Sequence, residues 1–182
     1  DGLGFLRALQ DEGGFVPEGS RVLILGAGGV ARGVVLALSR AKVATLIIAN
    51  RTMERAERLV ALAQSADTEG IAISLDGGNL TEAAGTADLI VNCTTIGMSH
   101  GPDEGGLPLP AASITSTVLV NDLVYNPLET PLLKAAAQAG ATCLGGILML
   151  VYQGAASFEM WTGRDAPVAV MLDSATKAMA SR

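Results

Sequence analysis

Residues 21–32 read RVLILGAGGVAR, and this stretch decides the fold of the chain. The four consecutive apolar residues from Val22 to Leu25 predict a strand that is buried on both faces, as in a parallel sheet. Three glycines follow within four positions, and the apolar run to about Ser39 predicts a helix directly after them. The first N–H groups of a helix have no intrahelical acceptor, and the helix dipole favours an anion beside them. The spacing Gly26-x-Gly28-x-x-Ala31 therefore fits a dinucleotide-binding turn, with a purely structural strand–helix turn as the alternative.

A second predicted strand, residues 44–49, leads into the polar tip Asn50-Arg51-Thr52. NAD sites carry Asp or Glu at this tip for the ribose 2′-hydroxyl, whereas NADP sites place Arg there for the 2′-phosphate. Arg51 can bind a phosphate through two parallel hydrogen bonds, and Arg55 follows one helical turn later. The tip therefore predicts NADP as the cofactor. In the alternative interpretation, Thr52 caps the next helix and Arg51 is solvated, and both interpretations can hold together.

Composition and charge narrow the class of protein. The chain has 182 residues, enough for one domain, and 49% of them are hydrophobic but only 3% aromatic, so we expect an aliphatic core. A formal net charge of −6 without a basic run argues against nucleic acid as a partner. We find no apolar stretch long enough to span a membrane and no secretory signal. Cys93 and Cys143 lie in separate strand-like runs, which predicts buried free thiols in a reducing cytoplasm rather than a metal site.

Strands and helices alternate along the rest of the chain. We expect further strands at 71–75, 88–93, 118–123 and 141–144, and helices at 53–65, 79–84, 130–139, 146–161 and 167–180. This alternation predicts an α/β fold, a Rossmann-like, doubly wound and mostly parallel six-stranded sheet with helices on both faces. Within a single NADP-binding domain, 1–182, we expect a linking helix at 1–16, the core sheet at 20–145 and C-terminal helices at 146–182.

Polar residues gather where the predicted strands end, which is the edge at which such sheets bind ligands. Asn92-x-Thr94 follows the fourth strand and Asp122–Tyr125 ends the fifth, on the same edge as the glycine turn and the Arg51 tip. Asn92 and Thr94 fit ligand contact and equally fit completion of backbone hydrogen bonds at the strand end. His100, the one histidine, is expected to be a solvated loop residue.

Six motifs occur in one order along the chain. They are DGLGF at 1–5, GAGGVAR at 26–32, NRT at 50–52, NCTTIGM at 92–98, DLVYNPLETPLL at 122–133 and GILMLVYQ at 146–153, the last followed by Phe158 and Trp161. Together these motifs resemble shikimate dehydrogenase, the NADP-dependent enzyme that reduces 3-dehydroshikimate in aromatic amino-acid (chorismate) biosynthesis. The resemblance covers the whole chain but only part of the family's fold. It implies an N-terminal substrate-binding domain outside this sequence, towards which the C-terminal helices would pack.

The resemblance also implies roles for individual residues. Asp1 resembles the family's catalytic aspartate, which also touches the substrate, and the lysine that partners it has no match here. Tyr125 and Gln153 match residues that contact shikimate. Cofactor contacts are implied at Gly26, Ala27, Gly28, Gly29, Val30, Asn50, Arg51, Thr52, Arg55, Thr94, Leu123 and Gly146, and no metal is implied.

Several alternatives stay open at the level of sequence. Asp1 also fits a helix cap, and Tyr125 also fits a core ring with a satisfied hydroxyl. Gln153 interrupts an apolar helix face, where its amide could both donate to and accept from a polyol. The implied activity is that of a cytoplasmic oxidoreductase acting on a small molecule, with a homodimer as a candidate assembly, and we expect this chain by itself to be inactive. The competing classes are a paralogous dehydrogenase for quinate or an aminated shikimate, and a non-catalytic NADP-binding module.

Overall fold

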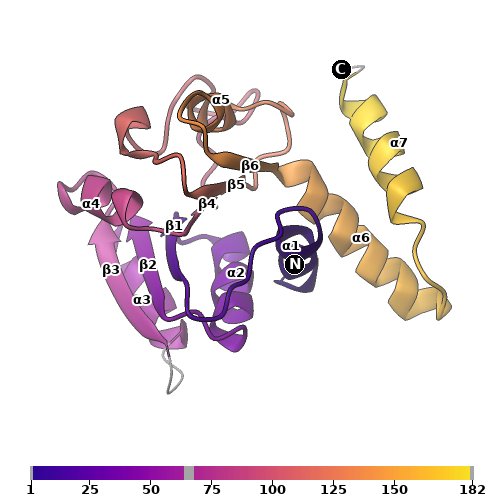
Figure 1. Cartoon of the computed structure of the whole chain (residues 1–182), viewed down its shortest axis with the longest axis horizontal. Helices are drawn as coiled ribbons and strands as arrows, with labels where there is room; N and C mark the ends of the chain where they lie inside the picture. Colours follow the sequence, from indigo (N-terminus) through magenta and orange to yellow (C-terminus); the bar gives the residue numbers. More distant parts are fainter. Residues whose placement is uncertain (1, 64–67, 181–182) are drawn as a thin grey trace.

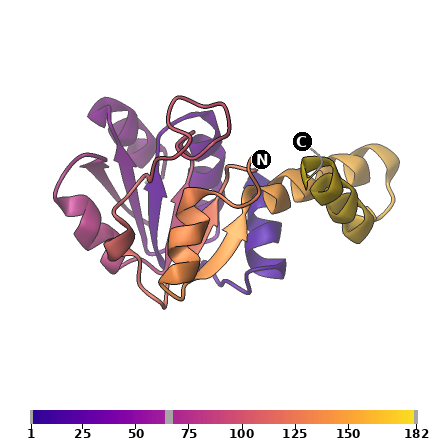
Figure 2. The same cartoon turned by 90° about the horizontal axis from the view of Figure 1, so that it is seen from above.

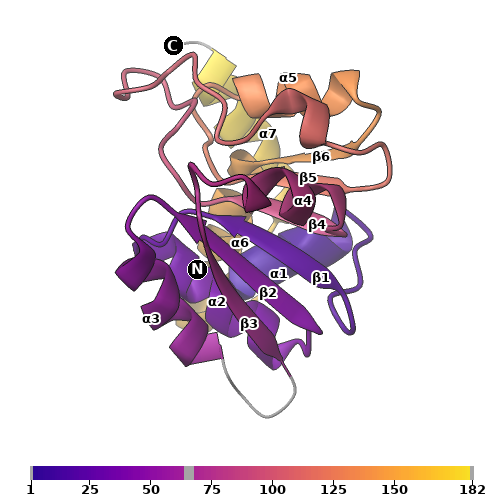
Figure 3. The same ribbon diagram turned by 90° about the vertical axis from the view of Figure 1, so that its left-hand side faces the viewer.

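The computed structural model describes residues 2–63 and 68–180. Six strands in these ranges form one wholly parallel sheet with the order β3-β2-β1-β4-β5-β6 (Figures 1 and 3). The strands are β1 (Arg21–Leu25), β2 (Thr45–Asn50), β3 (Glu69–Ser74), β4 (Leu89–Asn92), β5 (Leu119–Asp122) and β6 (Thr142–Gly145). The predicted doubly wound α/β fold is confirmed, and the sheet is parallel throughout rather than mostly so.

Helices connect the strands and cover both faces of the sheet. They are α1 (Gly2–Asp11), α2 (Gly29–Arg40), α3 (Met53–Ala63), α4 (Asn79–Gly85), α5 (Pro131–Gln138), α6 (Gly146–Thr162) and α7 (Val168–Ala180), with a 3-10 turn η1 (Ala111–Ser113). The N-cap of α5 is Thr130, whose hydroxyl accepts from the N–H of Leu133, and Pro131 occupies the first turn, where its missing N–H leaves no bond unmade.

The uninterrupted apolar run of β1 serves two separate cores. Val22 and Ile24 face α1, α2, α3 and α6, whereas Leu23 and Leu25 face α4, α5 and the loop around η1. Successive side chains of a strand point to opposite faces, so a strand covered on both sides needs an apolar residue at every position. The apolar run of β1 therefore already indicates that other elements cover the sheet on both faces.

The C-terminal helices leave the body of the domain. α6 packs beside α1 and then runs beyond the sheet, and α7 turns back along α6 (Figures 1 and 2). α7 has no buried residue, and Trp161 at the end of α6 is 82% exposed. Among the described residues, no helix is long and apolar enough to span a bilayer.

One expectation about the cysteines is wrong. Cys143 is exposed, whereas Cys93 is partly buried and packs against the core, and both thiols are free. Cys143 lies on β6, one of the two edge strands of the sheet, which has a neighbour on one side only and is exposed at Thr142 and Cys143. An apolar strand pattern does not reveal whether a strand is central or at the edge.

Candidate functional site

The turn after β1 requires glycine at its first position. Gly26 has a φ of +96°, and a Cβ atom there would lie 2.9 Å from Cγ2 of Thr94 and 3.2 Å from the backbone of Cys93. The N–H of Gly26 donates to the carbonyl oxygen of Ala49 at 2.7 Å. The ends of β1, β2 and β4 therefore meet at this turn, and a side chain would push them apart.

Asn50, predicted as a cofactor contact, has a supporting role that the sequence did not reveal. Its Oδ1 accepts from the backbone N–H of Ala27 at 3.1 Å, and its Nδ2 donates to the carbonyl oxygen of Thr52 at 2.9 Å. One amide thus joins the glycine turn to the tip that carries Arg51. The N–H of Ala27 is occupied by this bond, so the free donors of the turn begin after it.

The N-terminus of α2 is open and uncapped. Gly28, Gly29 and Val30 are exposed, and the N-cap residue Gly28 makes no side-chain cap hydrogen bond. A Cβ atom added to Gly28 or Gly29 would meet no atom within 4 Å. Free N–H groups, a helix dipole and open space are the features that let a phosphate approach.

The residues predicted for the 2′-phosphate lie on the solvent side of this turn. Arg51, Thr52 and Arg55 are all exposed. Arg51 also lines a shallow hollow between the ends of β2 and β3 and the loop 103–110, next to apolar Leu75 and Pro108. The predicted adenine side of the site is thus accessible, and its hollow combines the Arg51 cation and apolar surface with the carboxylates of Asp76 and Asp103.

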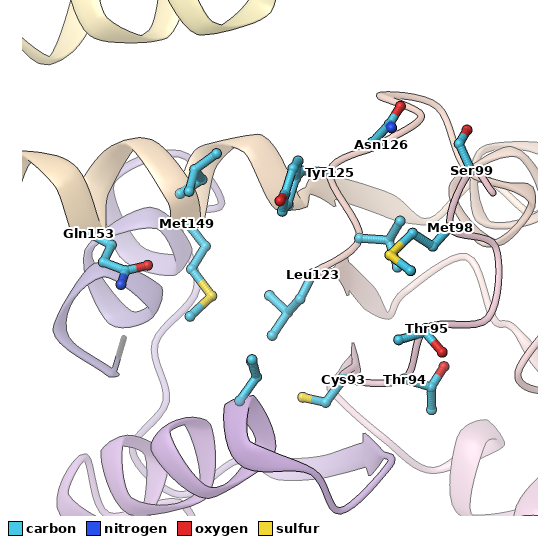
Figure 4. Close-up of a pocket in the computed structure, with 14 residues that line it drawn as sticks. Cys93, Thr94, Thr95, Met98, Ser99, Leu123, Tyr125, Asn126, Met149 and Gln153 are labelled. Atoms are coloured by element: carbon cyan, nitrogen blue, oxygen red, sulfur yellow. The ribbon is translucent and has the colours of Figure 1, made fainter. Parts of the chain in front are cut away.

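A cavity of about 370 Å³ continues from the turn over β4 and β5 (Figure 4). Its walls are α6, the loops that follow β4 and β5, and the first residues of α2. The lining residues are Val30, Cys93, Thr94, Thr95, Met98, Ser99, Leu123, Val124, Tyr125, Asn126, Gly146, Met149, Leu150 and Gln153. The structure therefore brings together six residues predicted for the site, namely Val30, Thr94, Leu123, Tyr125, Gly146 and Gln153.

The two predicted substrate contacts enter this cavity from different elements. Gln153 comes from α6, and Tyr125 comes from the loop after β5 (Figure 4). Tyr125 is 45% exposed, which contradicts the alternative of a core ring. Gly146 starts α6 in contact with that same loop, because a Cβ atom there would lie 2.7 Å from the carbonyl oxygen of Val124 and would clash with that of Leu123.

Asn92 and Thr94 form the strand-end network that the sequence left as an alternative. Oδ1 of Asn92 accepts from the N–H of Thr94 at 3.0 Å and from its hydroxyl at 2.7 Å, and that hydroxyl accepts from Ile96 N–H. Nδ2 of Asn92 donates to buried Asp122 at 2.9 Å. Asp122 belongs to a motif quoted above, but the sequence did not indicate a supporting role for it. Its hydrogen bond to Asn92 on the adjacent strand shows that role.

Three further expectations concern Asp1, metal ions and His100. Asp1, expected to be catalytic, lies outside the described residues. Over residues 2–63 and 68–180, no group of three or more His, Cys, Asp or Glu side chains is arranged to hold a metal ion. His100 lies exposed in the loop after β4, as expected.

The parallel sheet, the open glycine turn and the cavity beyond it define a dinucleotide-binding domain of the dehydrogenase type. Two family models match the chain, "Shikimate / quinate 5-dehydrogenase" over residues 13–98 and "Shikimate 5'-dehydrogenase C-terminal domain" over residues 146–176. The chain belongs to the shikimate dehydrogenase family.

Individual relatives agree with this assignment. The shikimate dehydrogenase (NADP(+)) of Methanopyrus kandleri is 47% identical over 175 residues, which are 96% of this chain and 60% of the relative. The crystal structure of the Thermus thermophilus enzyme with NADP(H) and shikimate has a TM-score of 0.81 at 35% identity, covering 96% of this chain and 60% of that one. A 5-ketofructose reductase of Gluconobacter has a TM-score of 0.86 at 35% identity, covering 97% and 62%. The chain thus spans about 60% of the length of these relatives.

Proposed function

We propose that this chain is the NADP-binding part of a shikimate dehydrogenase, which interconverts 3-dehydroshikimate and shikimate by hydride transfer. The observation that carries the proposal is the set of three features at the carboxyl ends of the strands: the exposed tip at Arg51, the open turn at Gly28 and Gly29, and the cavity lined by Tyr125 and Gln153. The relatives named shikimate dehydrogenase (NADP(+)) and the Thermus complex with NADP(H) and shikimate support it.

The chain's residues fit the cofactor in three places. The free N–H groups at the start of α2 would bind the pyrophosphate, and Gly28 and Gly29 leave the space for it. Arg51, with Thr52 and Arg55 nearby, would bind the 2′-phosphate. The nicotinamide end would enter the cavity over β4 and β5, where Thr94, Leu123 and Gly146 form the walls.

Bound NADP supplies the hydride acceptor, and the chain supplies orientation and exclusion of water. The Tyr125 hydroxyl and the Gln153 amide can hydrogen-bond to substrate hydroxyls at the nicotinamide end of the cavity. In this proposal Asp1 orients the substrate and its proton-transferring partner. That partner, a lysine in the family the chain resembles, would come from the portion of the protein outside this chain.

The C-terminal helices offer a surface for that portion. Met160 and Trp161 on α6 and Val170 on α7 are exposed apolar residues, and such residues on neighbouring helices mark contact surfaces. We propose that residues 146–182 pack against an N-terminal substrate domain and that the longer protein works in the cytoplasm, with a homodimer as its candidate assembly. The greater length of the relatives supports the additional domain.

A second candidate is a related dehydrogenase with another substrate. Two observations support this class: the 5-ketofructose reductase has the same fold at 35% identity, and the matching family model includes quinate dehydrogenases. A non-catalytic NADP-binding module is the remaining class. Substrate choice depends mainly on residues of the substrate domain, so the cofactor site is common to all three.

Two measurements separate these proposals. Calorimetric titration of this chain with NADP+ and NAD+ tests the cofactor site, and we expect binding with a clear preference for NADP+. A steady-state assay of the longer protein with shikimate, quinate and 5-ketofructose tests the reaction. Absence of cofactor binding would refute the site; binding without turnover of any of these substrates would favour the non-catalytic module. This chain assayed alone should show no activity.

A further inference from the structure

A buried carboxylate stands directly behind the wall of the cavity. Asp122 ends β5 and is 0% exposed, and the residues that follow it, Leu123 and Val124, line the cavity. On the neighbouring strand β4, Asn92 is the register partner of Asp122, and the next residue, Cys93, lines the cavity as well. The carboxylate thus lies one residue behind the lining on two adjacent strands.

The hydrogen bonds of Asp122 suit its charged form. Oδ1 accepts from Nδ2 of Asn92 at 2.9 Å and from the N–H of Val124 at 3.0 Å, and Oδ2 accepts from Oγ1 of Thr130 at 2.6 Å. The Thr130 hydroxyl itself accepts from Leu133 N–H, so its own proton points to Asp122. An ionised carboxylate only accepts hydrogen bonds, as Asp122 does here. Burial is the larger effect and raises the pKa of Asp122 above its usual value, and these three bonds offset part of that rise.

No cationic side chain neutralises this group within the described part of the chain. The ion pairs found there are Arg7–Glu159, Lys134–Glu129 and Lys177–Asp173, all without Asp122. The carboxylate lies close to the cavity wall, because Cys93 and Leu123, which follow Asn92 and Asp122, both line the cavity. Burial first, and then the charge of Asp122, raise the pKa of the Cys93 thiol. A charge in a region of low dielectric acts over a longer distance than one in water.

The position of Asp122 selects one end of the cofactor. In the strand order β3-β2-β1-β4-β5-β6, the predicted 2′-phosphate tip lies at the end of β2 and the pyrophosphate turn follows β1. The nicotinamide then falls over β4 and β5, beyond the turn. We propose that Asp122 supplies a negative charge behind the nicotinamide end of the cavity and so favours the oxidised, positively charged ring over the reduced, neutral one. This inference rests on the proposed cofactor site, and Asp122 acts through its field without touching the cofactor.

Asp122→Asn tests the inference because it keeps the shape of the side chain and removes its charge. The dissociation constants of NADP+ and NADPH are measured on the same preparations of this chain, with melting temperature as a check of folding. We expect NADP+ to bind more weakly by on the order of fivefold, with NADPH nearly unchanged. A purely structural role would weaken both forms alike and leave their ratio at the wild-type value.

Two further variants sharpen the test. Asp88→Asn is the matched control. Asp88 is an exposed carboxylate at the amino ends of the strands, where its Oδ2 accepts from Arg21 N–H at 2.8 Å. In this variant the ratio of the NADP+ and NADPH dissociation constants should stay at the wild-type value. The exchange Asn92→Asp with Asp122→Asn keeps one carboxylate beside one amide and should retain the wild-type ratio, even where Asp122→Asn alone does not fold. An unchanged ratio in Asp122→Asn, or a lost preference in the exchanged pair, would overturn the inference while cofactor binding stands. A wild-type chain that binds neither form would refute the proposed cofactor site and this inference with it.

Discussion

The side-chain oxygen of Asn50 accepts a hydrogen bond from the backbone N–H of Ala27, with 3.1 Å between the two atoms. The last residue of β2 thereby holds the glycine turn that follows β1. Because the same amide donates to the carbonyl oxygen of Thr52, it also holds the tip that carries Arg51. The two proposed phosphate sites are thus kept in register by one side chain.

Asn50→Ala should therefore weaken cofactor binding without unfolding the domain. Loss of each hydrogen bond costs about 0.5–1.5 kcal/mol, so we expect NADP+ affinity to fall roughly 2- to 10-fold for the bond to Ala27 alone. Calorimetric titration of this chain measures the affinity. Asn79→Ala, at an exposed position at the start of α4, is the control and should bind as the wild type does. Unchanged affinity in Asn50→Ala would mean that the turn keeps its shape without this amide.

Arg51→Ala should reduce the preference for NADP+ over NAD+. A charge-assisted contact to the 2′-phosphate accounts for a preference of about 2–3 kcal/mol, and NAD+ has no such phosphate. NADP+ affinity should fall while NAD+ affinity hardly changes. Arg58→Ala removes the same charge from an exposed position further along α3 and serves as the control. Equal affinities of wild type for both cofactors would contradict the role assigned to Arg51.

Gln153→Ala and Tyr125→Phe should impair substrate use in the longer protein. Each variant loses one hydrogen bond to a neutral substrate. The fall in kcat/KM for shikimate should therefore correspond to about 0.5–1.5 kcal/mol of transition-state stabilisation, or more where the bond strengthens in the transition state. NADP+ affinity should stay nearly constant. Gln138→Ala on the exposed face of α5 is the control. Lower melting temperature with unchanged kcat/KM would assign both residues to stability instead.

Gly4→Ala should disturb the contact between α1 and α6. A Cβ atom on Gly4 would lie 2.6 Å from the backbone nitrogen of Gln153 and 2.8 Å from its Cα atom, and neither backbone atom can move aside easily. Overpacking of this kind costs about 1–3 kcal/mol of stability. Gly154 lies next to Gln153 on α6. A Cβ atom there would meet only Cε of Met171 at 3.2 Å, so Gly154→Ala should be tolerated. Chemical denaturation measures the free energy of unfolding of both variants. Equal values for Gly4→Ala and Gly154→Ala would show that α1 shifts at little cost.

Tyr152 makes stability depend on pH in alkaline solution. Burial first, and then the hydrogen bond to Glu12 and its charge, raise the pKa of Tyr152 from 10.0 to about 12. Between these values the folded chain keeps a proton that the unfolded chain has lost. The stabilisation is therefore complete below pH 10 and is lost as pH rises towards 12.

Tyr152→Phe should flatten this loss. Denaturant midpoints measured from pH 9 to pH 12 provide the comparison. Glu12→Gln removes the charge and weakens the acceptor, so the folded pKa of Tyr152 should fall towards 10.0 and the loss should become smaller and end at a lower pH. The same slope in wild type and Tyr152→Phe would show that other groups control the alkaline range.

Much of the fold was predictable because its signals are local. The apolar run Val22–Leu25 lies within β1, Thr130-Pro131 starts α5, and Gly146 starts α6, as expected. Hydrophobic periodicity, helix capping and the need for glycine at positive φ all depend on residues that are close together in the sequence. The same local signals marked the glycine turn and the polar strand ends, and thereby most of the candidate site.

The sequence by itself thus determined the elements, their alternation and the edge of the sheet at which the candidate site lies. Only the tertiary structure decided which strand ends are neighbours. Asn92 and Asp122 are 30 positions apart, yet their side chains bond because β4 and β5 are adjacent, and Asn50 reaches Ala27 because β2 lies beside β1. The same strand order leaves Cys143 exposed on the edge strand. Hydrophobic periodicity indicates that a segment is a strand and which of its faces are apolar, but strand order, and with it the burial of an edge strand, depends on packing between distant segments, which no local pattern records.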